Sequence, residues 1–444
     1  MSAGVFTGRR NHELSLLVLG LIIGLGAIAI VAVARSTRRL EIAAPLMMLS
    51  AIGYVAAHIV VRRTAPQSDS LLLPIIAVLN LIGLAALYRL DPREYGPDQI
   101  IWTVVGLTFF VLTLLLVRDH RVLARYKYLF GFLGVALLLL PLSPIGATIN
   151  GARLWVRFGE FSFQPGELAK VCLVIFFAGY LAERKELLAR ATRKVASIHV
   201  PDIKHFGPLL VVWGLSLAVM FYETDLGSSL LFFSIFIAML YIATARFIYV
   251  ALGGLLFGAG AIVGYQVFTH VQERVQVWLD VFNPELIADE SHQLAQSLFA
   301  FATGGLFGTG LNQGRPYLIP AANTDFIYSV IGEELGLLGT AAVLLCFLLL
   351  VGRGLKIALE AHTDFGKLLA AGLITIFAVQ TLVILAGVTR LLPLTGITLP
   401  FMSYGGSSLL SNFVLFALLL RVSHETTTAP DPAATGEILI GGRE

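Results

Sequence analysis

Uncharged, apolar runs of about 20 residues recur along the whole chain, and they limit its possible folds more than any other feature. A helix needs ~20 residues to cross the ~30 Å hydrocarbon layer of a bilayer. Twelve runs meet or approach that length: 14–34, 42–61, 70–88, 100–117, 128–145, 168–182, 206–222, 226–245, 247–269, 335–352, 368–389 and 399–420. They predict an all-α polytopic membrane protein with about twelve transmembrane helices.

The composition excludes the main soluble classes. Of the 444 residues, 57% are hydrophobic and 13% are charged, and that charge is about half the ~25% of a typical soluble protein. The formal net charge of +3 is too small to indicate a nucleic-acid partner. Cys172 and Cys346 both lie inside apolar runs, which argues against a disulfide framework and against a structural zinc site.

The distribution of positive residues predicts the orientation, because lysine and arginine are retained on the cytoplasmic side of a membrane protein. With both termini inside, the inner segments hold 20 of the 31 Lys and Arg residues. Arg35, Arg38 and Arg39 are the exception, since they follow the first run and would face outward. The polar segments 146–167 and 223–225 and a large extracytoplasmic loop, 269–324, then face outward, so we expect any chemistry there. The segment 423–444 is typical of a disordered cytoplasmic tail.

The first outer segment combines cations with an aromatic residue. Gln164-Pro165 is a helix-start signal, which places Glu167 and Lys170 at i and i+3 on one face of the first turn. From position alone, a dipole-complementing Glu167 paired with Lys170 at the interface is favoured, with Arg153 attracted to lipid headgroups. The sharper hypothesis is that Lys170 and Arg153, beside Trp155, bind the diphosphate of a lipid-linked substrate.

Three acidic features follow. Glu223 and Asp225 could hold a metal or a proton in the turn between two helices, but helix capping is favoured. Asp325 follows Asn323-Thr324 and precedes an apolar helix, so capping is its simplest role as well. Glu333-Glu334 lies two turns further on, next to or inside the membrane, where ionisable groups are usually functional or paired.

Two glycine-rich segments flank the last helices. The segment 304–314, followed by Arg315, allows a tight backbone near a ligand but does not match a P-loop or a dinucleotide fingerprint. Ser403-Tyr404-Gly405-Gly406-Ser407-Ser408 precedes the last helix. Its small residues and hydroxyls could serve close helix packing, or Ser403 and Ser407 could give a polar lining to a groove that opens to lipid.

With these motifs in hand, the sequence resembles the SEDS family of bacterial cell-wall proteins, the RodA/FtsW/SpoVE group. The resemblance covers about 71–422, with four motifs in order: Asn150-Gly-Ala-Arg-Leu-Trp155 with Phe163-Gln-Pro-Gly-Glu-Leu-Ala-Lys170; Asp225-Leu-Gly227; Asn323-Thr-Asp-Phe-Ile327 with Gly332-Glu-Glu-Leu-Gly336; and Pro400-Phe-Met-Ser-Tyr-Gly-Gly-Ser-Ser408. Gly166 stands where the family usually has serine. The family's ten helices imply a glycosyltransferase membrane domain at 70–422, preceded by a two-helix extension, 1–69, like that of some RodA-type members.

The resemblance implies a peptidoglycan glycosyltransferase for cell shape or division, acting on the outer face of the cytoplasmic membrane. Such a protein polymerises lipid II into a nascent glycan strand, releases undecaprenyl diphosphate and works with a class B penicillin-binding protein. The essential outer-loop aspartate of the family falls on Asp325, and its Glu and Lys of the Gln-Pro-x-Glu-x-x-Lys motif fall on Glu167 and Lys170.

The reaction so implied inverts the anomeric carbon and needs one carboxylate as general base, for which Asp325 is the candidate. Diphosphate is a good leaving group and needs positive charge rather than an acid, so Lys170, Arg153 and Arg315 are candidates, alone or with Mg²⁺ or Mn²⁺. Two alternatives stay open. A flippase or transporter would explain about twelve helices and Glu333-Glu334, and a noncatalytic scaffold for a transpeptidase would explain the helices alone.

Overall fold

The computed structural model describes residues 2–35, 37–149, 152–159, 161–189, 193–195, 198–200, 207–223, 225–283 and 291–428. Within these, ten helices are long and apolar enough to cross a membrane, and the segments Lys127–Leu142 and Gly207–Met220 are shorter apolar helices. The prediction of an all-α polytopic membrane protein is confirmed.

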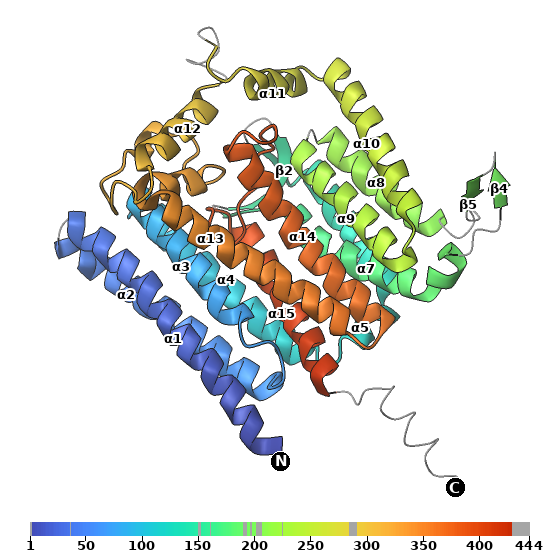
Figure 1. Ribbon diagram of the computed structural model, residues 1–444, viewed down its shortest axis with the longest axis horizontal. Coiled ribbons are helices and arrows are strands. Elements are labelled where there is room, and N and C mark those ends of the chain that lie inside the picture. Colours follow the sequence, from blue (N-terminus) through green and yellow to red (C-terminus); the bar gives the residue numbers. More distant parts are fainter. Residues whose placement is uncertain are drawn as a thin grey trace.

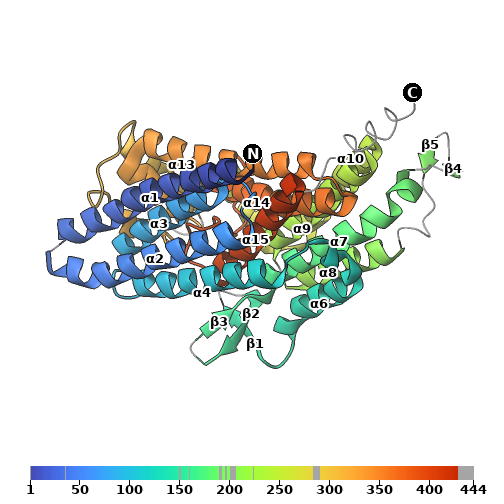
Figure 2. The ribbon, with the colours of Figure 1, turned by 90° about the horizontal axis from the view of Figure 1, so that it is seen from below.

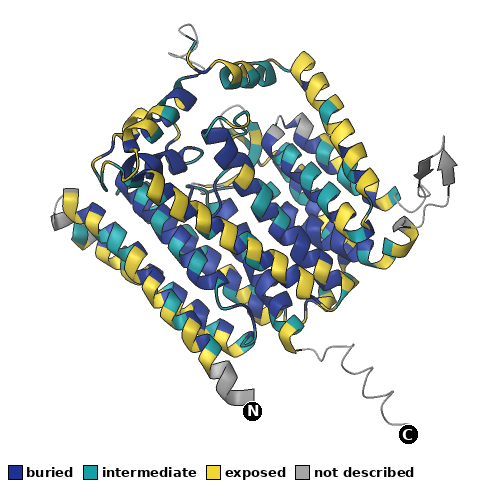
Figure 3. Ribbon diagram, viewed as in Figure 1, coloured by how far each residue is buried: buried dark blue, intermediate teal, exposed yellow. Residues whose placement is uncertain are grey.

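The ten long helices and the two shorter apolar ones form one bundle (Figure 1). Its helices are α1 (Ser2–Arg35), α2 (Thr37–Thr64), α3 (Leu72–Leu90), α4 (Tyr95–Leu116), α6 (Lys127–Leu139), α7 (Pro165–Ala189), α8 (Gly207–Tyr222), α9 (Leu226–Thr244), α10 (Phe247–Val267), α13 (Ile327–Glu360), α14 (Asp364–Val388) and α15 (Gly406–Thr428), and short α5 (Arg121–Arg125) precedes α6. In α15, 89% of the span is buried, against 17% in α10. Figure 3 shows the same contrast, with buried residues concentrated in the centre and exposed ones along α10, α1 and α2.

One end of the bundle, here called the loop face, carries further structure. The expected loop 269–324 contains α11 (Thr269–Leu279), α12 (His292–Gly304) and the 3₁₀ turn Pro316–Leu318. The segment after α6 forms an antiparallel sheet that we did not predict, of β1 (Gly146–Ile149), β2 (Ala152–Phe158) and β3 (Phe161–Phe163), in that order (Figure 2). Val156 of β2 is fully buried and pairs with both Gly146 and Phe163. The strands β4 (Arg193–Val195) and β5 (Ile198–Val200) pair separately.

Helix α13 is broken close to its start. Gly336 has φ 67° and ψ −165°, a conformation open only to glycine, and a side chain there would strike the backbone of Gly308 and Leu306. The first turns of α13, which carry Glu333 and Glu334, are therefore offset from its long second part.

The first two helices are fixed to the rest by close packing and by buried charges. Gly20 and Gly24 of α1 lie against Val78 and Leu81 of α3 so closely that a Cβ would clash. Closer to the N-terminus of α1, the Glu13 carboxylate accepts from Arg10, and its second oxygen lies 2.7 Å from His58 Nδ1 of α2. Unpaired polar groups would be costly inside a membrane, so the contact between Glu13 and His58 holds α1 and α2 together.

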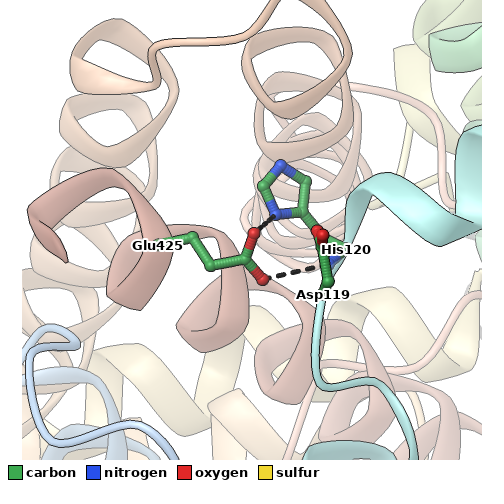
Figure 4. A group of neighbouring side chains, drawn as sticks. All are labelled: Asp119, His120 and Glu425. Carbon is green, nitrogen blue, oxygen red and sulfur yellow. Dashed lines mark hydrogen bonds and ion pairs between the residues drawn. The ribbon is translucent and has the colours of Figure 1, made fainter. Parts of the chain in front are cut away.

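The end of α15 corrects the predicted tail. We expected disorder from residue 423, but α15 continues to Thr428. Its last turns have partners at the face opposite the loop face: the Ser423 hydroxyl accepts from Asp69 N at 3.0 Å, and Glu425 accepts from His120 N at 3.0 Å and lies 2.6 Å from His120 Nδ1 (Figure 4). These contacts extend the helix beyond its apolar run. Residues 429–444 of the expected tail lie outside the described residues.

Cys172 and Cys346 are both free thiols.

Candidate active site at the loop face

Asp325 lies between the 3₁₀ turn and α13. The N-cap of α13 is Phe326, and no side chain caps the helix, so the prediction that Asp325 is a cap is wrong. An Asp325 carboxyl oxygen and Arg274 Nη2 lie 3.7 and 3.8 Å from the place that a Cβ on Gly396 would take. The carboxyl therefore lies beside the 394–396 turn and faces a cation.

Burial raises the pKa of the Asp325 carboxyl to about 6, against the lowering effects of Arg274 and of a hydrogen bond from Thr324. The group is mostly ionised at neutral pH, yet more basic than a surface carboxylate. A general base works best when its pKa lies near the working pH, and Asp325 meets that condition.

We did not predict a role for Arg274. It comes from α11, and its Nη1 donates to Leu394 O at 3.2 Å and to Thr395 O at 3.1 Å, so it ties α11 to the turn beside Asp325. The sequence held one signal, since Arg274 is the only Lys or Arg between residues 247 and 314.

Ser403 fixes the backbone next to Asp325. Its hydroxyl donates to Thr324 O at 2.6 Å and accepts from Leu399 N at 2.9 Å. Tyr404 N donates to Asn323 O at 2.8 Å. These bonds join the 399–404 turn to the residues before Asp325.

Glu167 and Lys170 form the predicted i, i+3 pair, at 2.9 Å, but both are buried, with 8% and 4% of their surfaces exposed. Lys170 Nζ also lies 3.2 Å from Gln380 Oε1, and Ser411 donates to Glu167 at 3.0 Å. The pair therefore lies inside the protein, away from solvent and lipid. Gln380, which we did not single out, is the one amide side chain in the apolar run 368–389.

A hydrogen-bonded path leads from this pair toward Asp325. Gln380 Nε2 donates to Thr398 O at 2.9 Å, and the Thr398 hydroxyl donates to Ser408 Oγ at 2.9 Å. Thr398 precedes Leu399, whose N–H donates to Ser403. The 394–408 segment therefore connects Gln380, the partner of Lys170, with the backbone of Asn323 and Thr324, which precede Asp325.

Asp225 caps α9 as predicted, accepting from Ser228 N at 2.9 Å. Burial raises the pKa of its carboxyl, and Glu167 and Lys170 both act on it through space. Burial and the nearby Asp225 raise the pKa of Glu223 to about 8. These carboxyls belong to the surroundings of the Lys170 pair.

The remaining expected substrate contacts lie elsewhere on the loop face. Arg153 donates to Pro141 O at 3.0 Å and to Ser143 O at 2.9 Å, so it fastens the sheet to the end of α6. Trp155 is half-buried in β2, opposite Ala147. The Ser407 hydroxyl accepts from Gln164 N at 2.8 Å, which joins the starts of α15 and α7. No described contact brings these side chains to Asp325.

Glu333 and Glu334 hold the glycine-rich loop. Glu333 accepts from Arg315 N at 2.9 Å, and Glu334 accepts from Asn312 N at 3.0 Å and from Arg89 at 3.0 Å. The Arg315 side chain is exposed and lines a separate cavity of about 460 Å³ with Gln296 and Gln313. Both glutamates are thus bound to protein groups, as expected of buried charges.

A possible metal centre lies far from Asp325. Among the described residues, the one group with at least three His, Cys, Asp or Glu ligand atoms close together is Asp119, His120 and Glu425, on the opposite face (Figure 4). Among the described residues of the loop face, Asp325 has no second and third His, Cys, Asp or Glu ligand atom close to it.

Comparisons with known proteins agree with this arrangement. Residues 69–428 match the FtsW/RodA/SpoVE family, described as "Cell cycle protein". The chain is 42% identical to the peptidoglycan glycosyltransferase RodA of Mycobacterium leprae, over 97% of this chain and 96% of that protein. It is 44% identical to the RodA of Mycobacterium tuberculosis, over 94% and 91%.

Two solved structures share the fold. One, described as "Structural coordination of polymerization and crosslinking by a peptidoglycan synthase complex", superimposes with a TM-score of 0.66 at 24% identity, covering 82% of this chain and 99% of that one. RodA of Thermus thermophilus superimposes with a TM-score of 0.56 at 24% identity, covering 81% and 97%.

Proposed function

The chain belongs to the FtsW/RodA/SpoVE family and is a peptidoglycan glycosyltransferase, and we propose that it polymerises lipid II with Asp325 as general base. The observation that carries this proposal is a partly buried carboxyl that caps no helix and lies beside Arg274 and the 394–396 turn, with its pKa raised to about 6. The loop face then lies outside the cytoplasmic membrane, where lipid II presents its sugars.

In the proposed reaction the 4-hydroxyl of the acceptor sugar attacks the anomeric carbon of the donor, and its proton passes to Asp325. The bond from that carbon to the diphosphate breaks with inversion, and undecaprenyl diphosphate leaves. Lys170 contributes positive charge toward the diphosphate, and the exposed Arg153 and Arg315, with Trp155, bind other parts of the substrate in this proposal. The buried Glu167, Ser403 and Ser407 hold the surrounding helices and turns in place. A class B penicillin-binding protein is the proposed partner.

One assay tests the function against its alternatives. Purified protein is incubated with lipid II, with and without the transpeptidase, and the products are separated by length. We expect long glycan strands and released undecaprenyl diphosphate. A flippase would move lipid II across vesicles without polymer, and a scaffold would do neither.

Charge balance predicts dependence on a divalent cation. Lys170 is already paired with Glu167, and Arg274 faces Asp325, so Arg153 and Arg315 would have to balance most of the negative charge of a diphosphate. We expect EDTA to stop polymerisation and added Mg²⁺ or Mn²⁺ to restore it. Unchanged activity in EDTA would contradict a role for the cation.

The fall of kcat/KM on the acid side of the pH profile should reflect the protonation of Asp325. The base must be ionised, so kcat/KM should fall as the pH drops below about 6. Arg274 opposes the rise in this pKa, and its removal in Arg274→Gln should raise the pKa and move the acid limb to higher pH. Arg274→Lys, which keeps the charge, should leave the limb in place. A limb that does not move in Arg274→Gln would show that another group titrates.

A further inference from the structure

Tyr54 lies in α2, one of the two helices before the family match. Its side chain is fully buried, and its hydroxyl donates to Asn80 Oδ1 of α3 at 2.9 Å. A buried tyrosine hydroxyl in an apolar bundle needs such a partner. The bond links the N-terminal helix pair to α3 in the interior of the protein.

Asn80 in turn binds the 399–404 turn. It is fully buried, and its Nδ2 donates to Phe401 O at 3.2 Å. Three residues along α3, the backbone of Gly83 lies so close to Met402 that a Cβ would come within 2.5 Å of Met402 Cα. Helix α3 thus determines where Phe401 and Met402 lie.

A second connection runs through aromatic rings. Tyr54 and Phe413 of α15 have ring centroids 6.4 Å apart. Phe413 in turn packs edge-on against Phe401, at 5.2 Å. Tyr54 therefore reaches Phe401 both through its hydroxyl and Asn80 and through its ring and Phe413.

Phe401 is the strained member of this group. Its φ is 65°, in the left-handed region, which is an outlier for a bulky residue. Such a conformation persists only where surrounding contacts enforce it, and it is common at functional sites. When those contacts weaken, we expect the turn to relax.

Relaxation of the Phe401 backbone would shift the position of Asp325. Ser403, two residues later, donates to Thr324 O at 2.6 Å, and its own carbonyl accepts from Gln99 at 3.2 Å. Thr324 directly precedes Asp325. The contacts from Tyr54 to Asp325 are thus continuous, and the side chains of Asn80, Phe401 and Ser403 along the route are buried.

We propose that Tyr54 is a positioning residue for Asp325, so that the N-terminal helix pair takes part in setting the active-site geometry. This proposal rests on the proposed role of Asp325 as general base. It concerns the orientation of the base and not the binding of substrate, and it therefore predicts an effect on kcat.

The test is Tyr54→Phe, which removes the hydroxyl and keeps the ring against Phe413. We expect kcat for lipid II polymerisation to fall about threefold to tenfold, the effect of one lost hydrogen bond, with KM unchanged. Tyr241→Phe is the matched control, because Tyr241 is 42% exposed on α9. Both variants should melt close to wild type. A wild-type kcat for Tyr54→Phe would overturn the proposal.

A double-mutant cycle tests the route through Asn80. In an Asn80→Ala background, Tyr54→Phe should cause little further loss of kcat, because residues that act through one another are not additive. An equal loss in both backgrounds would refute this route. Asp325→Asn separates the two proposals. If Asp325→Asn is inactive while Tyr54→Phe has a normal kcat, only the positioning role of Tyr54 is refuted. If Asp325→Asn is active, the proposed role of Asp325 as general base is refuted.

Discussion

Asp325→Asn is expected to polymerise lipid II at least 100-fold more slowly than wild type and to melt at the same temperature. General-base catalysis contributes about 100-fold to 10,000-fold, and an amide of the same shape cannot accept the proton. Stability should be retained because Asp325 caps no helix, whereas loss of a cap would cost about 1 kcal/mol. Burial already disfavours the charged carboxylate, as its raised pKa indicates, so a neutral amide should be well tolerated. Initial rates and melting curves on one preparation measure both quantities.

Asp280→Asn is the matched control, since Asp280 is an exposed aspartate at the end of α11 on the same face. It should polymerise normally. A rate for Asp325→Asn within a few fold of wild type would refute the proposed base, and a large drop in melting temperature would assign Asp325 a structural role.

Local sequence patterns were sufficient where both partners lie within one helical turn. The pair Glu167–Lys170 and the Asp225 cap follow from i, i+3 spacing alone. The partners of Asp325 and Lys170 were not predictable in that way, because Arg274 and Gln380 are brought in by the packing of other helices. A single sequence does not state which helices are neighbours, so it can only mark these residues as isolated polar groups.

The same limit explains the roles that were misjudged. Asp325 has the residue type and position of a cap, but the chain turns at Phe326 and leaves the carboxyl free of that role. Glu333 and Glu334 look like transport residues in a hydropathy profile, and only the folded loop shows that they accept from Arg315 N and Asn312 N. The sheet β1–β3 was not predicted because the polar segment 146–167 is typical of a loop, whereas the seven residues of β2 form a strand.

Lys170→Met should lose both activity and stability, and the two losses can be separated. Removal of one member of a buried ion pair leaves the other charge unpaired, at a cost of about 3 to 5 kcal/mol. The Glu167 carboxylate would keep only the Ser411 bond among the contacts described here. If Lys170 also stabilises the leaving diphosphate, the rate should fall about 100-fold to 1,000-fold beyond any loss of folded protein.

The double variant Glu167→Gln/Lys170→Met distinguishes these effects. Replacing a buried ion pair by neutral side chains of similar volume is often neutral or stabilising, so the double variant should recover most of the melting temperature. Activity should stay low, because the cation needed at the diphosphate is still missing. Recovery of both together would mean that the pair only holds α7 against α14 and α15, and the leaving-group charge would then have to come from another cation. If the single variant Glu167→Gln polymerises lipid II at the wild-type rate, Lys170 acts on the diphosphate without its partner.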